Sequence, residues 1–390
     1  MATQSNNRIN YFARANYRND RRIFGIKQAD RRSHMYLIGK TGTGKTTLLE
    51  RMIEQDIASG AGLVLLDPHG DLVERLIEIV PENRKSDLIY FNVPDTTNPL
   101  GFNPLQNIIP AKRPLAASGL LEAFKKIWAE SWGPRLEHIL RNALIALLDQ
   151  PEVNLGDILR LLDDSEYRKN AALNVVNAQV RHFWLHEYSG YPAHFRAEAI
   201  APIQNKVGAF LSNPVLHGIL TRAKSDFDLR QVMDQGKILL VNLAKGKIGE
   251  DSAALLGAIL VSKIGQTALS RADMPESNRR DFFVFLDEFQ NFMTLSFAGM
   301  LSELRKYRVN LLLAHQYLSQ LDLQIRDAII GNVGTIISFR LGLTDAEILE
   351  KEFYPEFEAA DLINLPNYSV YLKLMIDGMV SKPFSAETLS

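Results

Sequence analysis

The 390-residue sequence contains no cysteine, which excludes a disulfide framework and a thiolate metal site. It also lacks any run of about 18 uninterrupted apolar residues, so no direct membrane span is predicted. The most apolar helical stretch, 253–264, includes Ser262 and Lys263. The first residues have no apolar segment of the kind found in secretory signals. These absences favour a cytoplasmic protein.

The chain has almost no excess charge of either sign, with a formal net charge of −1. A protein that coats DNA usually carries a strong positive charge, so wrapping of DNA is disfavoured. A protein that forms a ring and contacts DNA only through the lining of its pore is still compatible with this net charge. The hydrophobic share of 46% is that of an ordinary globular protein. The length favours a large domain that carries a second, smaller one.

Residues 1–32 are predicted to form a basic N-terminal arm. The acids in this range are Asp20 and Asp30. The basic residues are Arg8, Arg14, Arg18, Arg21, Arg22, Lys27, Arg31 and Arg32. Such an arm could touch nucleic acid or a neighbouring subunit, and a solvated tail is an equal alternative. The apolar residues within 23–26 could pair as an edge strand.

Short apolar runs then alternate with helical stretches, which indicates parallel strands in an α/β sheet covered on both faces. The predicted strands are 34–38, 63–66, 88–92, 238–243, 282–286, 311–314 and 335–339. Near the end, 370–376 and 379–384 flank Asp377-Gly378, a dipeptide favoured in two-residue hairpins. The fold class predicted is therefore α/β.

Between the strands lies a long region with helical periodicity and no convincing strand, after a break rich in proline. We interpret it as an all-α domain inserted into the sheet domain. The predicted boundaries are 33–110 for the first part of the sheet domain, 111–230 for the insert, and 231–390 for the second part.

The segment Gly39–Thr46 matches the phosphate-binding pattern G-x-x-x-x-G-K-[ST] in full. An apolar strand precedes it and an amphipathic helix follows, which disfavours a glycine-rich turn that binds nothing. We expect Lys45 to contact the β- and γ-phosphates of ATP and the Thr46 hydroxyl to ligate Mg²⁺. The residues expected to bind the nucleotide are Gly39, Thr41, Gly42, Thr43, Gly44, Lys45, Thr46 and Thr47.

The apolar run 282–286 ends in Asp287 and Glu288. A buried strand can end in acids simply because it reaches solvent. Beside a phosphate loop, however, the pair predicts a hydrolytic site: Asp287 would hold Mg²⁺ through its water shell, and Glu288 would polarise the attacking water. ATP and Mg²⁺ are therefore the expected cofactors.

Other polar residues follow the strands. Gln316 could bond the γ-phosphate or the lytic water, with a local backbone bond as the alternative, and His315 is expected to pack. Asp67 could support the metal site, whereas Asp71 could cap the next helix. The scattered histidines His182, His186 and His194 lack a carboxylate frame, so metal binding there is disfavoured.

The ordered set of motifs resembles the HerA/FtsK superfamily of DNA-pumping ATPases, and most closely the TraD/TraG-like conjugative coupling proteins of type IV secretion. The likeness covers about residues 23–385. It rests on the segments 39–46, 67–71, 283–290 and 304–310, on Gln316, and on the helical insert. It implies a homohexamer with a RecA-like P-loop NTPase domain, an all-α domain at one mouth, and DNA in the channel. Partners would be DNA of undetermined strand type and a nuclease, a relaxase or a secretion system.

The sequence departs from such coupling proteins in lacking their initial membrane helices. We therefore also consider a soluble relative that acts with a nuclease in DNA processing or phage defence. The most serious rival function is an ATPase that energises transfer or remodelling of protein substrates. A transporter-type ATPase is disfavoured because the L-S-G-G-Q signature is absent, and strands after Gln316 disfavour a remodelling ATPase with a helical lid.

Two basic segments carry further predictions. The resemblance places an arginine supplied to the neighbouring subunit at Arg305, with Arg340 as a reserve. A solvated basic helix end is the alternative explanation for this segment. The loop 244–247, with Lys245 and Lys247 around Gly246, is predicted to contact DNA in the pore, or else to be an ordinary solvated turn.

Overall fold

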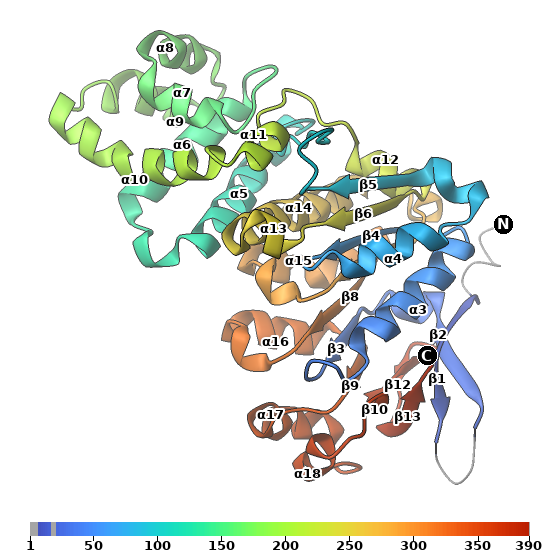
Figure 1. The fold of residues 1–390 in the computed structure, drawn as a ribbon. Coiled ribbons are helices and arrows are strands. Elements are labelled where there is room, and N and C mark those ends of the chain that lie inside the picture. The colour runs from blue at the N-terminus through green and yellow to red at the C-terminus, as the bar shows by residue number, and fades with distance from the viewer. Residues whose placement is uncertain (1–6, 17–20, 390) are drawn as a thin grey trace. The chain divides into compact units, whose positions relative to one another are not determined.

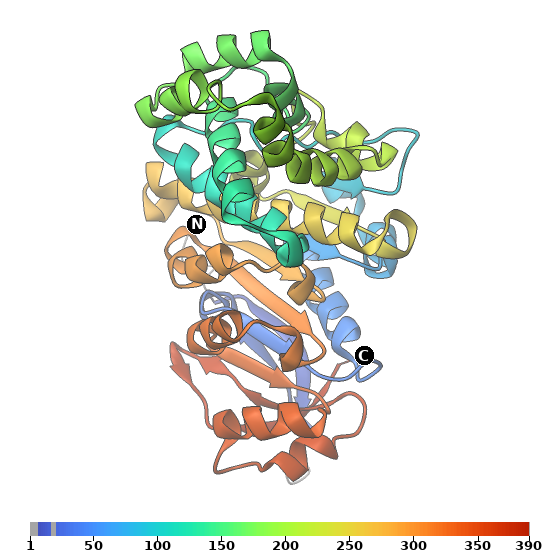
Figure 2. The same cartoon turned by 90° about the vertical axis from the view of Figure 1, so that its left-hand side faces the viewer.

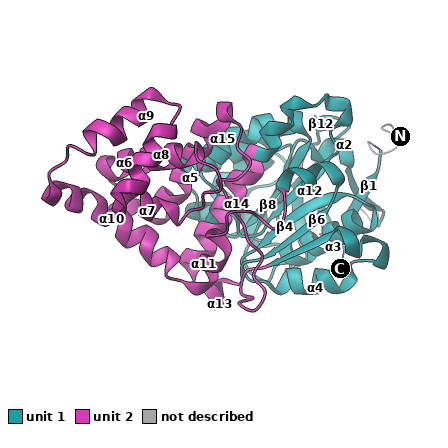
Figure 3. Ribbon diagram, turned by 90° about the horizontal axis from the view of Figure 1, so that it is seen from above, with its two compact units in different colours: residues 1–91, 229–243, 267–390 teal, residues 92–228, 244–266 magenta. Residues whose placement is uncertain are grey.

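In the computed structural model, which describes residues 7–16 and 21–389, the chain divides into two compact units (Figure 3). The first comprises Met1–Phe91, Leu229–Leu243 and Thr267–Ser390, and the second comprises Asn92–Asp228 and Ala244–Gln266. The second unit therefore starts earlier than the predicted insert and takes in a further segment after residue 243.

The first unit is built on an 11-stranded sheet with the order β2-β1-β13-β10-β9-β3-β8-β7-β4-β6-β5 (Figure 1). The strands are β1 (Ile9–Ala15), β2 (Ile23–Lys27), β3 (Met35–Ile38), β4 (Gly62–Asp67), β5 (Leu88–Asn92), β6 (Ile238–Asn242), β7 (Phe282–Leu286), β8 (Val309–His315), β9 (Thr335–Ser338), β10 (Ser369–Lys373) and β13 (Phe384–Thr388). The predicted α/β class with parallel central strands is confirmed.

The central strands are continuous apolar runs because both of their faces are covered. Every residue of β3, β4, β6, β7 and β8 is buried. Helices α3 (Lys45–Ala58) and α4 (Asp71–Ile79) share one hydrophobic cluster with one face of the sheet. Helices α15 (Leu295–Leu304), α16 (Leu323–Asn332) and α17 (Leu343–Phe353) lie on the other face (Figures 1 and 2).

The remaining α-helices are shorter connections or belong to the second unit. They are α2 (Gln28–Arg31), α5 (Arg113–Ile127), α6 (Pro134–Leu148), α7 (Asp157–Asp163), α8 (Ser165–Asn174), α9 (Ala178–His182), α10 (Ala193–Leu211), α11 (Pro214–Leu220), α12 (Leu229–Gln235), α13 (Lys245–Ile248), α14 (Glu250–Ser270) and α18 (Ala359–Ile363). In the second unit, α6 packs against α5, α7 and α10, around buried side chains such as Leu140 and Trp184.

Helix α14 is longer than the apolar stretch recognised in the sequence. Residues Glu250–Asp273 form one helix that is long and apolar enough to cross a membrane, and 78% of its most apolar window is buried. A buried helix of this kind is also what the core of a folded domain contains. The segment 244–247 was predicted to be a basic loop. Most of it instead belongs to α13, a single helical turn that follows Ala244, whose φ is 28°.

The last strands close the sheet with antiparallel pairs. Strand β10 pairs with both β9 and β13. The predicted hairpin is present as β11 (Met375–Ile376) and β12 (Met379–Val380). Between them Asp377 has φ 51° and Gly378 has φ 80°, as a two-residue turn of type I′ requires. Strands thus follow Gln316, as the sequence indicated.

The N-terminal region differs from the predicted basic arm. Strands β1 and β2 join the sheet, and β1 also pairs with β13. Phe12 and Ala13 are fully buried. Four of its basic residues bind acids far along the chain: the pairs are Arg21–Glu387, Lys27–Asp377, Arg31–Asp56 and Arg32–Asp281. Counting charge within 1–32 missed these partners. Arg18 and Asp20 lie outside the described residues.

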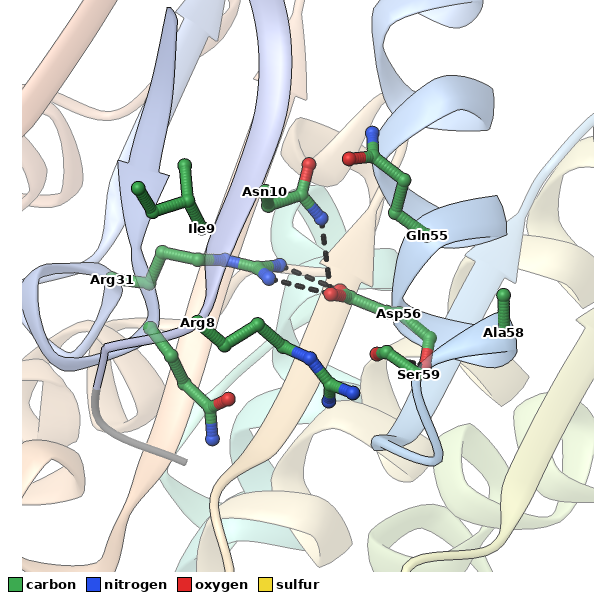
Figure 4. Close-up of a pocket in the computed structure, with 9 residues that line it drawn as sticks. Arg8, Ile9, Asn10, Arg31, Gln55, Asp56, Ala58 and Ser59 are labelled. Atoms are coloured by element: carbon green, nitrogen blue, oxygen red, sulfur yellow. Dashed lines mark hydrogen bonds and ion pairs between the residues drawn. The ribbon is translucent and has the colours of Figure 1, made fainter. Parts of the chain in front are cut away.

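The pair formed by Arg31 and Asp56 is the most buried of these contacts (Figure 4). Both guanidinium bonds to the carboxylate measure 2.7 Å, and Asn10 donates a third bond to Asp56 at 3.0 Å. The same guanidinium carbon lies 3.7 Å from the centre of the Phe283 ring. Arg31 belongs to α2, Asp56 to α3 and Asn10 to β1, so these bonds hold the three elements together.

Removing the charge of Asp56 alone should strongly destabilise the first unit, because Arg31 would remain charged and buried. We expect Asp56→Asn to lower the free energy of unfolding by about 3–5 kcal/mol, and Arg31→Met with Asp56→Leu to recover much of that loss. Thermal and urea unfolding measure both. Glu50→Gln is the matched control, because the Arg75–Glu50 pair is exposed and should contribute less than about 1 kcal/mol. Equal losses for Asp56→Asn and Glu50→Gln would contradict this assignment.

Candidate functional site

The candidate site lies where four parallel strands end side by side. Strand β3 pairs with β8 so that Ile38 faces His315, and β7 pairs with β8 so that Leu286 faces Leu313. Strand β4 follows on the far side of β7. The polar residues after these strands therefore meet at one edge, where ligands bind in open α/β sheets.

The phosphate loop connects β3 to α3 with two glycines in left-handed conformations. Gly42 has φ 75° and Gly44 has φ 117°. A Cβ on Gly42 would meet no atom within 4 Å, so this side of the loop is open. The first N–H groups of α3 have no acceptor within the helix. Loop and helix together can therefore hold an anionic phosphate chain.

Lys45 is the first residue of α3 and is buried, with 8% of its surface exposed. Its ammonium donates to the backbone carbonyls of Gly39 and Lys40. Burial lowers the pKa of Lys45, while the charges of Asp287 and Glu288 act in the opposite direction. The next residue, Thr46, is exposed. The lysine is thus held inside the loop, and the threonine hydroxyl remains available to a ligand.

Asp287 follows β7 and is 7% exposed. Burial, then the charges of Asp67 and Glu288, raises the pKa of Asp287 to about 6. A buried carboxylate beside two other acids favours a nearby cation. Within the described residues no three His, Asp or Glu side chains form a metal cluster. The Thr46 hydroxyl and the Asp287 carboxylate nevertheless fit Mg²⁺, which is commonly bound by one or two protein groups together with phosphates and waters.

Glu288 stands at the centre of a hydrogen-bonded chain. It has φ 44° and is 8% exposed. Gln316 donates to Glu288 Oε1 at 2.8 Å, and Thr41 donates to Gln316 Oε1 at 2.9 Å. His69 Nε2 lies 3.0 Å from the same carboxylate oxygen of Glu288. The structure therefore links the phosphate loop to the acid through Gln316, rather than leaving Gln316 on local backbone.

The role of His69 was not foreseen from the sequence, although the segment 67–71 was placed at this edge. Asp67 accepts backbone bonds from His69, Leu72 and Val73 at 2.8, 2.9 and 3.2 Å. It therefore caps the start of α4, whereas Asp71 is the first residue of that helix. The same carboxylate thus holds the backbone of His69, whose side chain reaches Glu288.

His315 packs in the core beside the site. Its Nδ1 lies 3.1 Å from the Tyr36 hydroxyl, and its ring centre lies 4.8 Å from that of Phe289. Burial lowers the pKa of His315 to about 3. The ring is thus neutral at ordinary pH, and it packs against Tyr36 and Phe289 at the end of β8.

The two arginine candidates lie at opposite ends of the central strands, with Arg305 before the start of β8 and Arg340 after the end of β9. Arg305 opens a 3₁₀ turn, Arg305–Tyr307, just before β8 begins, and its side chain is exposed. Arg340 follows β9 at the same edge as the phosphate loop. Its carbonyl accepts a bond from Lys40 at 2.9 Å, and its guanidinium donates to Leu365 O and Asn367 Oδ1.

Comparisons with known proteins agree with this architecture. The conjugative coupling protein TrwB without its first 70 residues has a TM-score of 0.65 and 16% identity, over 100% of this chain and 90% of that chain. TrwB in complex with ADP and Mg²⁺ gives 0.63 and 15%, over 100% and 90%. VirB4 of Thermoanaerobacter pseudethanolicus gives 0.64 and 13%, over 98% and 96%. These likenesses show a shared RecA-like fold.

No curated protein matches the sequence. A family profile does match it, from residue 23 to residue 347, and describes the DNA-binding domain of type IV secretion-system coupling proteins. The match spans most of the chain and includes every motif at the carboxyl edge of the sheet. The chain therefore belongs to the type IV secretion-system coupling protein family, as the resemblance of its motifs predicted.

Proposed function

We propose that the protein is a ring-forming ATPase that couples ATP hydrolysis to DNA translocation in the cytoplasm, as a conjugative or DNA-processing motor. The observation that carries the proposal is the linked set of Thr41, Gln316 and Glu288 beside the phosphate loop. It joins the group that would bind phosphate to the acid that would act on water. The family's DNA-binding domain supports DNA as the cargo.

Nucleotide binding would use the open loop around Gly42, the ammonium of Lys45 and the hydroxyl of Thr46. Bound Mg²⁺ would neutralise charge on the phosphates. The partners contributed by the chain itself are Asp287 for the ion and Glu288 for the water. Gln316 bonds Glu288 and Thr41 at once, so it can exchange one of these bonds for the γ-phosphate and thereby register whether that phosphate is present.

Lys45→Ala and Glu288→Gln should both abolish hydrolysis and yet differ in binding. Loss of the Lys45 ammonium removes ground-state attraction for phosphate, so ADP and ATP should bind more weakly. Glu288→Gln keeps the size of the side chain and should bind ATP without turning it over. Calorimetry and phosphate release measure the two effects. Unaltered nucleotide affinity in Lys45→Ala would sink the assignment.

The neighbouring chain should supply the arginine that completes the site. Strand β8 has seven residues and is about 23 Å long at about 3.3 Å per residue. It separates Arg305 from the edge where its own phosphate loop lies, so Arg305 can serve only a loop of another subunit. Arg340 is already bound within its own chain, which favours Arg305.

We expect Arg305→Ala to bind ATP and assemble normally, and to hydrolyse ATP about 10³–10⁵ times more slowly. Lys306→Ala, which removes the adjacent exposed cation, is the control and should hydrolyse normally. Mixing Arg305→Ala with Lys45→Ala should restore part of the activity, because some interfaces then join an intact loop to an intact arginine. No restoration in rings shown to be mixed would exclude Arg305.

DNA should stimulate ATP hydrolysis, and the basic segment after β6 is the proposed contact. Lys247 is exposed and Lys245 half-buried on α13. Lys245→Ala with Lys247→Ala should weaken DNA stimulation and reduce the salt slope of DNA binding by about one per lysine. Lys169→Ala with Lys224→Ala removes equal charge from the same unit and is the control. A rate of ATP hydrolysis that neither duplex nor single-stranded DNA changes would instead favour a protein cargo.

A further inference from the structure

A tyrosine outside every sequence motif touches the phosphate loop. Tyr368 precedes β10, and its backbone N–H donates to the carbonyl of Thr43 at 2.8 Å. On the other side, the N–H of Thr388 donates to the carbonyl of Tyr368, also at 2.8 Å. The backbone of Tyr368 is therefore held between the loop and β13.

The ring of Tyr368 lies against Gly44, the residue just before helix α3. A Cβ built on Gly44 would stand 2.8 Å from its Cδ1 and 3.3 Å from its Cε1. Tyr368 is nevertheless 48% exposed. One part of the ring thus covers the glycine, and a large part remains open to solvent beside the place where phosphates would bind.

The backbone of Tyr368 is strained. Its φ is 65°, a left-handed conformation that is a genuine outlier for a bulky residue. Such strain persists where surrounding contacts impose it, and it gathers at binding and catalytic sites. The two backbone bonds described above hold the Tyr368 backbone in this conformation, and the ring packs against Gly44.

The segment that carries Tyr368 is anchored at a second point. Arg340 donates to Leu365 O at 3.1 Å and to Asn367 Oδ1 at 2.9 Å, while its own carbonyl accepts from Lys40. Residues 365–368 are therefore tied to both ends of the phosphate loop. This arrangement gives Arg340 a positioning role that differs from that of an arginine acting on a neighbour.

The strand order decides which end of a nucleotide this segment meets. Glu288 and Gln316 follow β7 and β8, on one side of β3, so the terminal phosphate must face that side. Tyr368 precedes β10 and Arg340 follows β9, on the other side of β3. A nucleotide that extends from the terminal phosphate across the loop therefore brings its base toward Tyr368.

We propose that the exposed face of Tyr368 is the stacking platform for the base of the bound nucleotide, and that it favours a purine. A flat ring stacks on any base, and a two-ring base offers more overlap than a one-ring base. This inference rests on the proposed function, because it assumes that the loop binds a nucleoside triphosphate.

The test compares ligands with and without a base. Calorimetry would measure binding of ADP and of inorganic tripolyphosphate, both with Mg²⁺, to the full chain. Tyr368→Asn removes the ring but keeps a residue that tolerates the left-handed backbone. It should weaken ADP binding about tenfold and leave tripolyphosphate binding unchanged, whereas Tyr368→Phe should bind both like the unchanged protein. Tyr11→Ala, at an exposed tyrosine on β1, is the control.

A second variant reports contact directly. Tyr368→Trp should show fluorescence that ADP quenches and tripolyphosphate does not, after subtraction of the signal of the unchanged protein. Wild-type affinity for ADP in Tyr368→Asn, or equal weakening of both ligands, would overturn the stacking role. Failure of the unchanged protein to bind either ligand would overturn the proposed function and this inference with it.

Discussion

The parallel alignment of β3, β8 and β7 is the constraint on which the rest of the site depends. Side chains alternate between the faces of a strand, so a shift of one residue would move each buried set to the opposite face. Helices cover both faces of these strands, which fixes the alignment. With Ile38 beside His315 and Leu313 beside Leu286, the loops that follow these three strands begin at one edge. Gln316 can therefore bond both Thr41 and Glu288.

The central sheet and the core of the site could be predicted because their signals are local. A strand, a glycine-rich loop and a helix follow one another in 35–58, and a buried run ends directly in Asp287 and Glu288. Parallel pairing then brings their ends together. The edge strand at 23–26 was predicted and is present as β2. Strand β1 and the ion pairs of this region were not predicted, since the partners of Arg31 and Arg32 lie at Asp56 and Asp281, far outside any short window.

The parts of the site that the sequence did not reveal are those set by loop conformation. His69 lies beside Glu288, and its backbone N–H is bound by Asp67, which also accepts bonds from the first turn of α4. From the sequence, capping of this helix was considered only as one explanation of Asp71. Tyr368 reaches Gly44 because its backbone adopts a left-handed conformation between Thr43 and Thr388. No periodicity marks either position. Each becomes visible only when segments distant in sequence are placed beside the loop.

The pairing of β1 with β13 has a consequence for the order of folding. Strand β1 is synthesised long before its partner β13, which ends at Thr388, so this side of β1 stays unpaired while the segments between them are made. Contacts of such long sequence separation form slowly, and unpaired strand edges favour association with other chains. The nucleotide-binding edge waits as well, because β8 and β7 lie between β3 and β4 in the sheet and are made later. Synthesis of β13 then allows this pair to form.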